Sequence, residues 1–134
     1  MGHSASSMPI HYECDDAAKR VVIKTSGEVT SEEVLETLDR QAAEHAWSFA
    51  VLYDAREGGN QPTRQEMLRL VQRVGELTAA HGPRGPVAFL VAPGHALLDT
   101  GRKYSRLGEL TAMKVRVFTN LEEADQWLQL VHPS

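Results

Sequence analysis

Phe49-Ala50-Val51-Leu52-Tyr53 and Val87-Ala88-Phe89-Leu90-Val91 are two short, nearly continuous apolar runs. Runs of this length without polar alternation are typical of strands that are buried on both faces, as in parallel sheets. Between them, apolar residues recur at helical spacing after a capping-box pattern formed by Thr63 and Glu66. Strands that alternate with helices imply right-handed crossovers and a largely parallel sheet. These two runs therefore predict the centre of an α/β domain.

The residues before this centre predict an antiparallel hairpin and a first helix. Ile10 to Cys14 alternates apolar and polar residues, and Arg20 to Thr25 is rich in β-branched and apolar residues. Two such runs around a polar turn are typical of a hairpin, and the alternation in the first indicates a strand with one face in water. Gly27 ends the second strand, and a capping box at Thr30 opens a helix that runs to about His45.

The residues after the centre complete the expected fold. They predict a third helix over 97–110, a short strand over 114–118 and a last helix over 120–131. The expected fold class is α/β, with a mixed, mostly parallel sheet of about five strands flanked by about four helices. Residues 9–134 are expected to form this single domain, and residues 1–8 a disordered tail or a remnant of expression.

Composition limits the function before any motif is considered. The 134 residues carry a formal net charge of -4, a pI of about 5.8 and one cysteine. An acidic chain lacks the basic stripe that nucleic-acid binding needs. No apolar run approaches the roughly 20 residues of a transmembrane segment, and Met1 to Met8 lacks the apolar centre of a signal peptide. We therefore expect a cytoplasmic protein that binds no nucleic acid.

Several short segments, taken in chain order, match a known pattern. They are spread along the chain, and they are Gly27 to Glu33, Leu52 to Arg56, Pro86 to Phe89, Arg102 to Ser105, Val117-Phe118, Glu123-Ala124 and Trp127-Leu128. In this order and spacing the chain resembles the SpoIIAA-like branch of the STAS domains, over about residues 9 to 131. The resemblance implies a mixed sheet flanked by helices and a regulatory, non-enzymatic role.

One departure from that family concerns its phosphorylation site. STAS domains of the anti-sigma-factor-antagonist type carry a phosphorylatable serine between the third strand and the second helix, in an Asp-Ser-Ser-Gly-like segment. The corresponding stretch here, Glu57 to Thr63, contains no serine. The hydroxyl of Thr63 is already explained as a helix N-cap, and the sequence leaves its phosphorylation open. Relatives of this branch also look similar to CRAL-TRIO lipid-transfer domains, which implies a small amphipathic or lipid-like ligand.

The candidate ligand-binding residues follow the two central strands. Ligands of open α/β sheets bind beyond the carboxyl ends of the strands. Asp54 and Arg56 follow the first apolar run, and Gly94 and His95 follow the second. Arg56 could bind an anion through two N–H groups, a neutral His95 could donate a hydrogen bond, and Tyr104 on the third helix would form a wall. Asp54 and Arg56 also have a simpler interpretation as a cap or loop anchor, and His95 as a loop residue in water.

A second candidate is a basic surface made of Arg84, Arg102, Lys103 and Arg106. It could dock an anionic partner or a membrane surface, although such a cluster is more often simply a solvated face. No spacing of His or Cys matches a metal site, so neither a metal nor another cofactor is expected.

Three function hypotheses remain open from the sequence. The first is a regulatory domain that binds a small amphipathic ligand at the carboxyl edge of the sheet. The second is a homodimeric protein-interaction module that pairs through the strand edge Ile10–Cys14. The third and least favoured is an enzyme with a site assembled from loops, such as His95 with Asp54.

Overall fold

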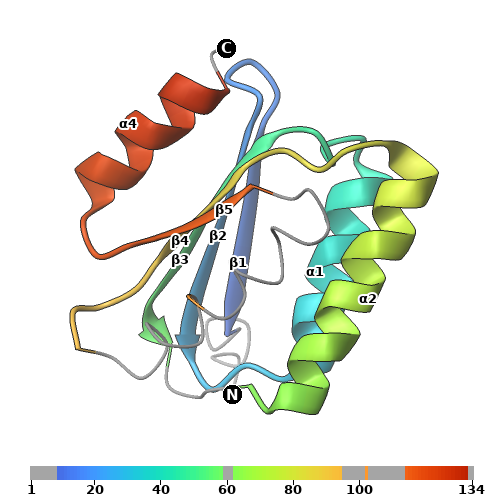
Figure 1. Ribbon diagram of the computed structural model, residues 1–134, viewed down its shortest axis with the longest axis horizontal. Coiled ribbons are helices and arrows are strands. Elements are labelled where there is room, and N and C mark those ends of the chain that lie inside the picture. The colour runs from blue at the N-terminus through green and yellow to red at the C-terminus, as the bar shows by residue number, and fades with distance from the viewer. Residues whose placement is uncertain (1–8, 59–61, 95–101, 103–113, 133–134) are drawn as a thin grey trace, which may run out of the picture.

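The computed structural model describes residues 9–58, 62–94, 102 and 114–132 (Figure 1). In this part of the chain five strands form one sheet: β1 (Ile10–Asp15), β2 (Arg20–Gly27), β3 (Ala50–Gly58), β4 (Val87–Leu90) and β5 (Val115–Phe118). The helices are α1 (Ser31–Ala43), α2 (Arg64–His81) and α4 (Leu121–Val131). The helix expected over 97–110 lies outside the described residues, apart from Arg102, which is helical and exposed.

The strands lie side by side in chain order, from β1 at one edge to β5 at the other. β1 is antiparallel to β2, and each of the following neighbours is parallel. Every parallel pair is joined by a connection long enough to cross one face of the sheet. The expected antiparallel hairpin and the mixed, mostly parallel sheet are therefore confirmed.

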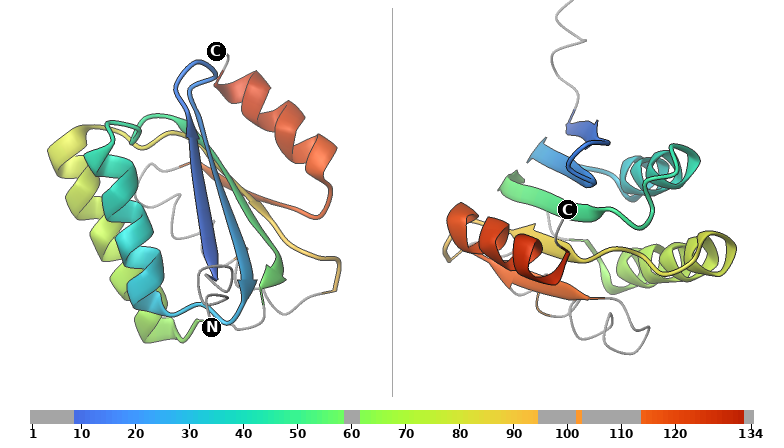
Figure 2. Two further views of the ribbon diagram at one scale, coloured as in Figure 1. Left: turned by 180° about the vertical axis from the view of Figure 1, so that it is seen from behind. Right: turned by 90° about the horizontal axis from the view of Figure 1, so that it is seen from above.

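The sheet lies between two helical layers. α1 and α2 cover one face, and α4 covers the other (Figures 1 and 2). Alternate residues of β3 divide between these layers, as expected for a strand buried on both sides. Val51 packs into the larger core under α1 and α2, whereas Ala50 and Leu52 pack into the smaller core under α4. The tilted ring contact of Phe118 with Trp127 belongs to the smaller core.

Side-chain caps fix where each helix begins. Thr30 and Thr63 both form complete capping boxes with the glutamate three residues later, and the Asn120 side chain accepts from the backbone N–H of Glu123. These contacts satisfy N–H groups that have no partner within the helix. α2 ends at Gly82, whose φ of 92° favours glycine. All three helix starts expected from the sequence at these residues are confirmed.

β3 is longer than its apolar run. It continues through Glu57 to Gly58, because β3 still pairs with β2 as far as Gly27. The pairing shifts between Lys24 and Ser26, where β3 contains one residue more than β2. An extra residue of this kind is a β-bulge, which bends and twists the strand locally. Polar and glycine residues that resemble a turn therefore extend the sheet at its carboxyl edge.

Gly85 brings the segment before β4 into close contact with the segment before β3. Its N–H donates to the carbonyl oxygen of Trp47 at 3.0 Å. A Cβ atom on residue 85 would overlap the backbone carbonyl groups of Ser48 and Phe49. A residue without a side chain is therefore required here, and its neighbour Arg84 is held at a fixed place beside the larger core.

Candidate functional site

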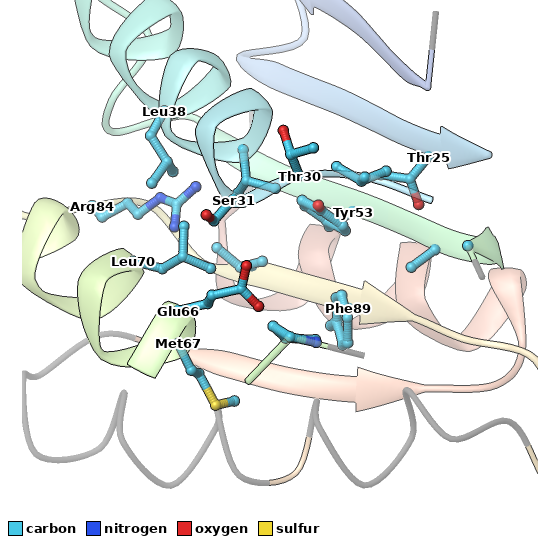
Figure 3. A pocket seen from close by; sticks show the side chains of 16 residues that line it. Thr25, Thr30, Ser31, Leu38, Tyr53, Glu66, Met67, Leu70, Arg84 and Phe89 are labelled. Atoms are coloured by element: carbon cyan, nitrogen blue, oxygen red, sulfur yellow. The ribbon is translucent and has the colours of Figure 1, made fainter. Parts of the chain in front are cut away.

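A cavity of about 130 Å³ lies between α1, α2 and the sheet. Its lining extends from Thr25 and Gly58, near the carboxyl ends of β2 and β3, to Arg84 and Val87 at the start of β4, which we call its inner end. Thr25 and Arg84 lie on opposite sides of it in Figure 3. Its lining is mostly apolar and comes from strands, helices and connections, namely Thr25, Val29, Thr30, Ser31, Val34, Leu38, Tyr53, Ala55, Gly58, Pro62, Glu66, Met67, Leu70, Arg84, Val87 and Phe89.

Strand alternation decides which residues of β3 reach the cavity. Tyr53 and Ala55 face it, and the Tyr53 ring lies 5.3 Å from the Phe89 ring of β4. Asp54 stands between them in sequence and therefore faces the opposite side of the sheet, as do its register neighbours Lys24 and Leu90. The carboxylate of Asp54 consequently does not line the cavity.

A cation is positioned at the inner end of the cavity. Nη2 of Arg84 donates to Oε1 of Gln41 at 3.2 Å, and its guanidinium lies 4.8 Å from the centre of the Trp47 ring. Gln41 is fully buried and also donates to the carbonyl oxygen of Ala46 at 2.9 Å, so its amide is fixed at both ends. Trp47 is buried as well, and its indole N–H donates to Thr78 at 3.3 Å. These contacts hold the Arg84 guanidinium in one place beside an apolar space.

An anion reaches the same cavity from the start of α2. Figure 3 shows the Glu66 carboxylate and the Arg84 guanidinium extending toward the same space from different segments. Oε1 of Glu66 accepts from the backbone N–H of Thr63 at 2.9 Å, and this hydrogen bond is the main cause that lowers the pKa of Glu66. Ser31, at the start of α1, is buried nearby and adds a hydroxyl to the lining. The cavity thus combines an apolar wall with a few charged or polar groups, as ligand sites do.

The sequence candidates Asp54 and Arg56 lie together, but on the other face of the sheet. Nε and Nη2 of Arg56 donate to the two carboxylate oxygens of Asp54 at 3.0 and 2.8 Å, and the Arg56 backbone N–H donates to Oδ1 at 3.1 Å. Burial by itself raises the pKa of Asp54, but these hydrogen bonds and the charge of Arg56 outweigh it and lower the pKa. The arrangement agrees with the simpler interpretation of both residues as a local structural pair.

The remaining sequence candidates are placed as follows. Gly94 is exposed, with a φ of 73°, and it does not line the cavity. His95, Tyr104, Lys103 and Arg106 lie outside the described residues, and Arg102 is exposed. Arg84, expected on a basic surface, is half-buried and lines the cavity.

The described residues contain neither a candidate metal-binding cluster nor a helix that could span a membrane. Within residues 9–58, 62–94, 102 and 114–132, no group of three or more His, Cys, Asp or Glu side chains could hold a metal ion. No helix in the same ranges is both long and apolar enough to cross a membrane.

The sequence could identify the cavity residues only as members of the hydrophobic core. Met67 and Leu70 mark the inner face of α2, and Val34 and Leu38 mark that of α1, because they recur at helical spacing. This spacing identifies the buried face but does not show that space remains beside it. Every second side chain of a strand points to the same face, and this alternation along β3 would have placed Tyr53 and Ala55 on the side of α1 and α2 and Asp54 on the other side.

The order of the strands and the helical layers define a STAS-like α/β fold. Among solved structures, the chain is similar to the phosphorylated form of SpoIIAA, a cell fate determinant of Bacillus, with a TM-score of 0.52 and 19% sequence identity. The similarity covers 88% of this chain and 98% of that one, so it extends over essentially the whole domain. No family model and no curated protein sequence matches the chain. The expected SpoIIAA-like fold is confirmed.

Proposed function

We propose that the chain is a non-enzymatic, STAS-like regulatory domain that binds a small amphipathic molecule in the cavity between α1, α2 and the sheet. The observation that carries this proposal is the cavity itself, an apolar space of about 130 Å³ with the fixed cation of Arg84 at its inner end. Its outer end lies where the parallel strands finish, which is where open α/β sheets bind ligands.

The size of the cavity limits the ligand. An apolar protein cavity of about 150 Å³ holds a molecule the size of benzene. The ligand, or the part of it that enters, is therefore a single ring or a short aliphatic chain. Its apolar part would contact Leu38, Leu70 and Phe89, and a polar group would contact Arg84 or Glu66. This revises the expected binding residues, because Asp54 and Arg56 lie on the other face.

A regulatory role is supported by the likeness to SpoIIAA, a protein that determines cell fate and has a phosphorylated form. In this chain a hydroxyl at the start of α2 is that of Thr63, the N-cap residue, which accepts from the N–H of Glu66 at 3.1 Å. The Glu66 carboxylate also lies against the Thr63 backbone. A phosphate on Thr63 would meet that negative charge and break the capping box, so we favour ligand binding over phosphorylation as the signal.

The enzyme alternative is less well supported. It paired His95 with Asp54, but the carboxylate of Asp54 is buried and bound through both oxygens by Arg56. A lowered pKa makes a carboxylate a weaker proton acceptor. A binding domain needs no such group.

The first test is native mass spectrometry of freshly purified protein, followed by denaturation of the same sample. A small mass that leaves on denaturation would identify the ligand. In parallel, benzyl alcohol and benzoate serve as ring-sized probes in a titration of ¹⁵N-labelled protein. Shifts confined to residues around the cavity, such as Val34, Leu70 and Phe89, are the expected result.

Two variants assign these shifts to the cavity. Val34→Phe adds a ring to a lining position of α1 and should weaken probe binding by about tenfold or more. Leu68→Phe adds the same ring to α2 at a side chain that is 48% exposed and does not line the cavity, so binding should be unchanged. A protein that carries no ligand, and whose spectrum responds to neither probe, would contradict the proposal.

A further inference from the structure

The outer edge of β1 carries backbone groups that point away from the sheet. β1 is the first strand in the order, and in the described residues β2 is its sole neighbour. The carbonyl oxygen of Pro9 accepts from the N–H of Ser26 at 2.9 Å, which identifies Pro9 and Ser26 as a hydrogen-bonded pair of the antiparallel ladder. Such pairs alternate along the strands. The N–H and C=O groups of Ile10, Tyr12 and Cys14 therefore point outward.

The side chains of β1 are sorted onto two faces. His11 and Glu13 are exposed on the outer face, and the His11 ring lies 2.9 Å from a Glu13 carboxylate oxygen. Tyr12 is buried in the larger core, with Ile10 and Cys14 partly buried beside it. A strand with one wet and one apolar face can continue a sheet only if its partner presents the same faces.

We propose that a second copy of the chain pairs with this edge, antiparallel and centred on Tyr12, so that the two sheets become one. In this register Ile10 lies opposite the partner's Cys14, and Tyr12 lies opposite the partner's Tyr12. All three residues with outward backbone groups then form hydrogen-bonded pairs, which gives about six backbone hydrogen bonds. Both copies contribute the same surface, as in most symmetric dimers.

The exposed charges favour the same register. His11 lies opposite the partner's Glu13, and Glu13 opposite the partner's His11. These positions are non-hydrogen-bonded pairs, in which side chains approach most closely. Each acidic side chain therefore meets an imidazole that can donate a hydrogen bond, and no two acidic side chains are opposed.

The neighbouring registers are less favourable. A shift that sets Glu13 opposite the partner's Glu13 opposes two carboxylates and leaves the outward groups of Ile10 without a strand partner. A shift in the other direction opposes two His11 side chains and loses the pair of Ile10 with Cys14. A shift of one residue would place the apolar side chains of one copy on the wet face of the other.

The dimer is independent of the ligand cavity, because no residue of β1 lines it. One edge strand of six residues buries less than the roughly 1,200 Å² of a standard stable interface. Association is therefore expected to depend on protein concentration in the micromolar range or above, and sedimentation velocity at several concentrations measures it directly.

A disulfide trap tests the register. Ile10→Cys places a thiol opposite the partner's Cys14, and backbone separations of about 5.5 Å in such pairs allow a disulfide. Positions 10 and 14 of one strand are about 13 Å apart, so a bond within one chain is excluded. Under mild oxidation the Ile10→Cys variant should form a covalent dimer. The matched control His11→Cys, with its thiol on the other face, should not.

A charge exchange gives a second test that needs no oxidation. His11→Glu places a carboxylate at position 11 opposite the partner's Glu13, and this repulsive pair occurs twice in the symmetric dimer. The variant should therefore weaken dimerisation at least several-fold. The double variant His11→Glu/Glu13→Lys restores opposite charges and should recover the dimer. The proposal would be overturned by a wild-type protein that stays monomeric at every concentration tested, by a trap no more efficient than its control, or by a double variant as weak as the single one.

Discussion

Asp54 and Arg56 form a two-pronged ion pair within one strand, two residues apart at the β-bulge of β3. The two guanidinium contacts measure 3.0 and 2.8 Å, and the Arg56 backbone N–H adds a third donor to the same carboxylate. The side chain of Asp54 is 8% exposed and that of Arg56 41%. A buried carboxylate is thus stabilised by a cation that itself lies at the surface.

Removing Arg56 should therefore destabilise the fold. We expect Arg56→Ala to lower the free energy of unfolding by about 1–3 kcal/mol at neutral pH, because Asp54 stays buried without two of its donors. The effect should be smaller than for a fully buried pair, since Arg56 is partly solvated. Urea unfolding measures it. Lys24→Ala, which removes the exposed ion pair of Lys24 with Glu57 and only the smallest of the effects on Asp54, is the control and should cost less than about 1 kcal/mol.

The same pair predicts a dependence on acid. Since the pKa of Asp54 is lowered in the fold, its stabilising effect is complete above the unfolded value of about 4 and is lost as pH falls through the lower folded value. The difference in unfolding free energy between the wild type and Asp54→Asn should shrink below about pH 4. A difference that stays constant down to pH 2 would contradict this assignment.

The capping box of α2 should be worth about 1 kcal/mol. Thr63→Ala removes the oxygen that accepts from the Glu66 N–H and should lower the unfolding free energy by about that amount. Thr63→Ser keeps the oxygen and should remain close to the wild type. A Ser variant as unstable as the Ala variant would show that the methyl group of Thr63, and not its hydroxyl, stabilises this helix start.

Tyr12 should make the protein sensitive to alkali. Its pKa is raised, first by burial and then by the nearby negative charge of Glu44. A group whose folded pKa is raised contributes stability that is complete below the unfolded value, near 10, and that is lost as pH rises further. Tyr12→Phe cannot ionise and should lose less stability between pH 10 and 12 than the wild type. Unfolding curves that respond equally to pH would refute a buried, ionisable Tyr12.

Local features of this fold could be predicted because neighbouring residues cause them. The starts of α1, α2 and α4 follow from a hydroxyl or amide side chain that reaches an N–H three residues later. The wet and apolar faces of β1 follow from its alternation, which the structure reproduces residue by residue.

The end of β3 and the candidate site could not be predicted in the same way. Glu57 and Gly58 resemble the start of a loop, and their pairing with β2, beyond the bulge, keeps them in the sheet. The cavity depends on how much volume Val34, Leu38 and Leu70 leave between the helices and the sheet. Hydrophobic spacing shows that these side chains are buried, but it contains no measure of the space beside them.

A substitution of Gly85 would change the cavity from a position that does not line it. Its N–H is bonded to Trp47, and a side chain at this position would push against the backbone of Ser48 and Phe49. Any substitution there must move the connection between α2 and β4, and Arg84 moves with it. The charge of the cavity can therefore be relocated by a mutation at a position that does not line it. Variants of position 85 offer a way to alter ligand preference without replacing any residue that lines the cavity.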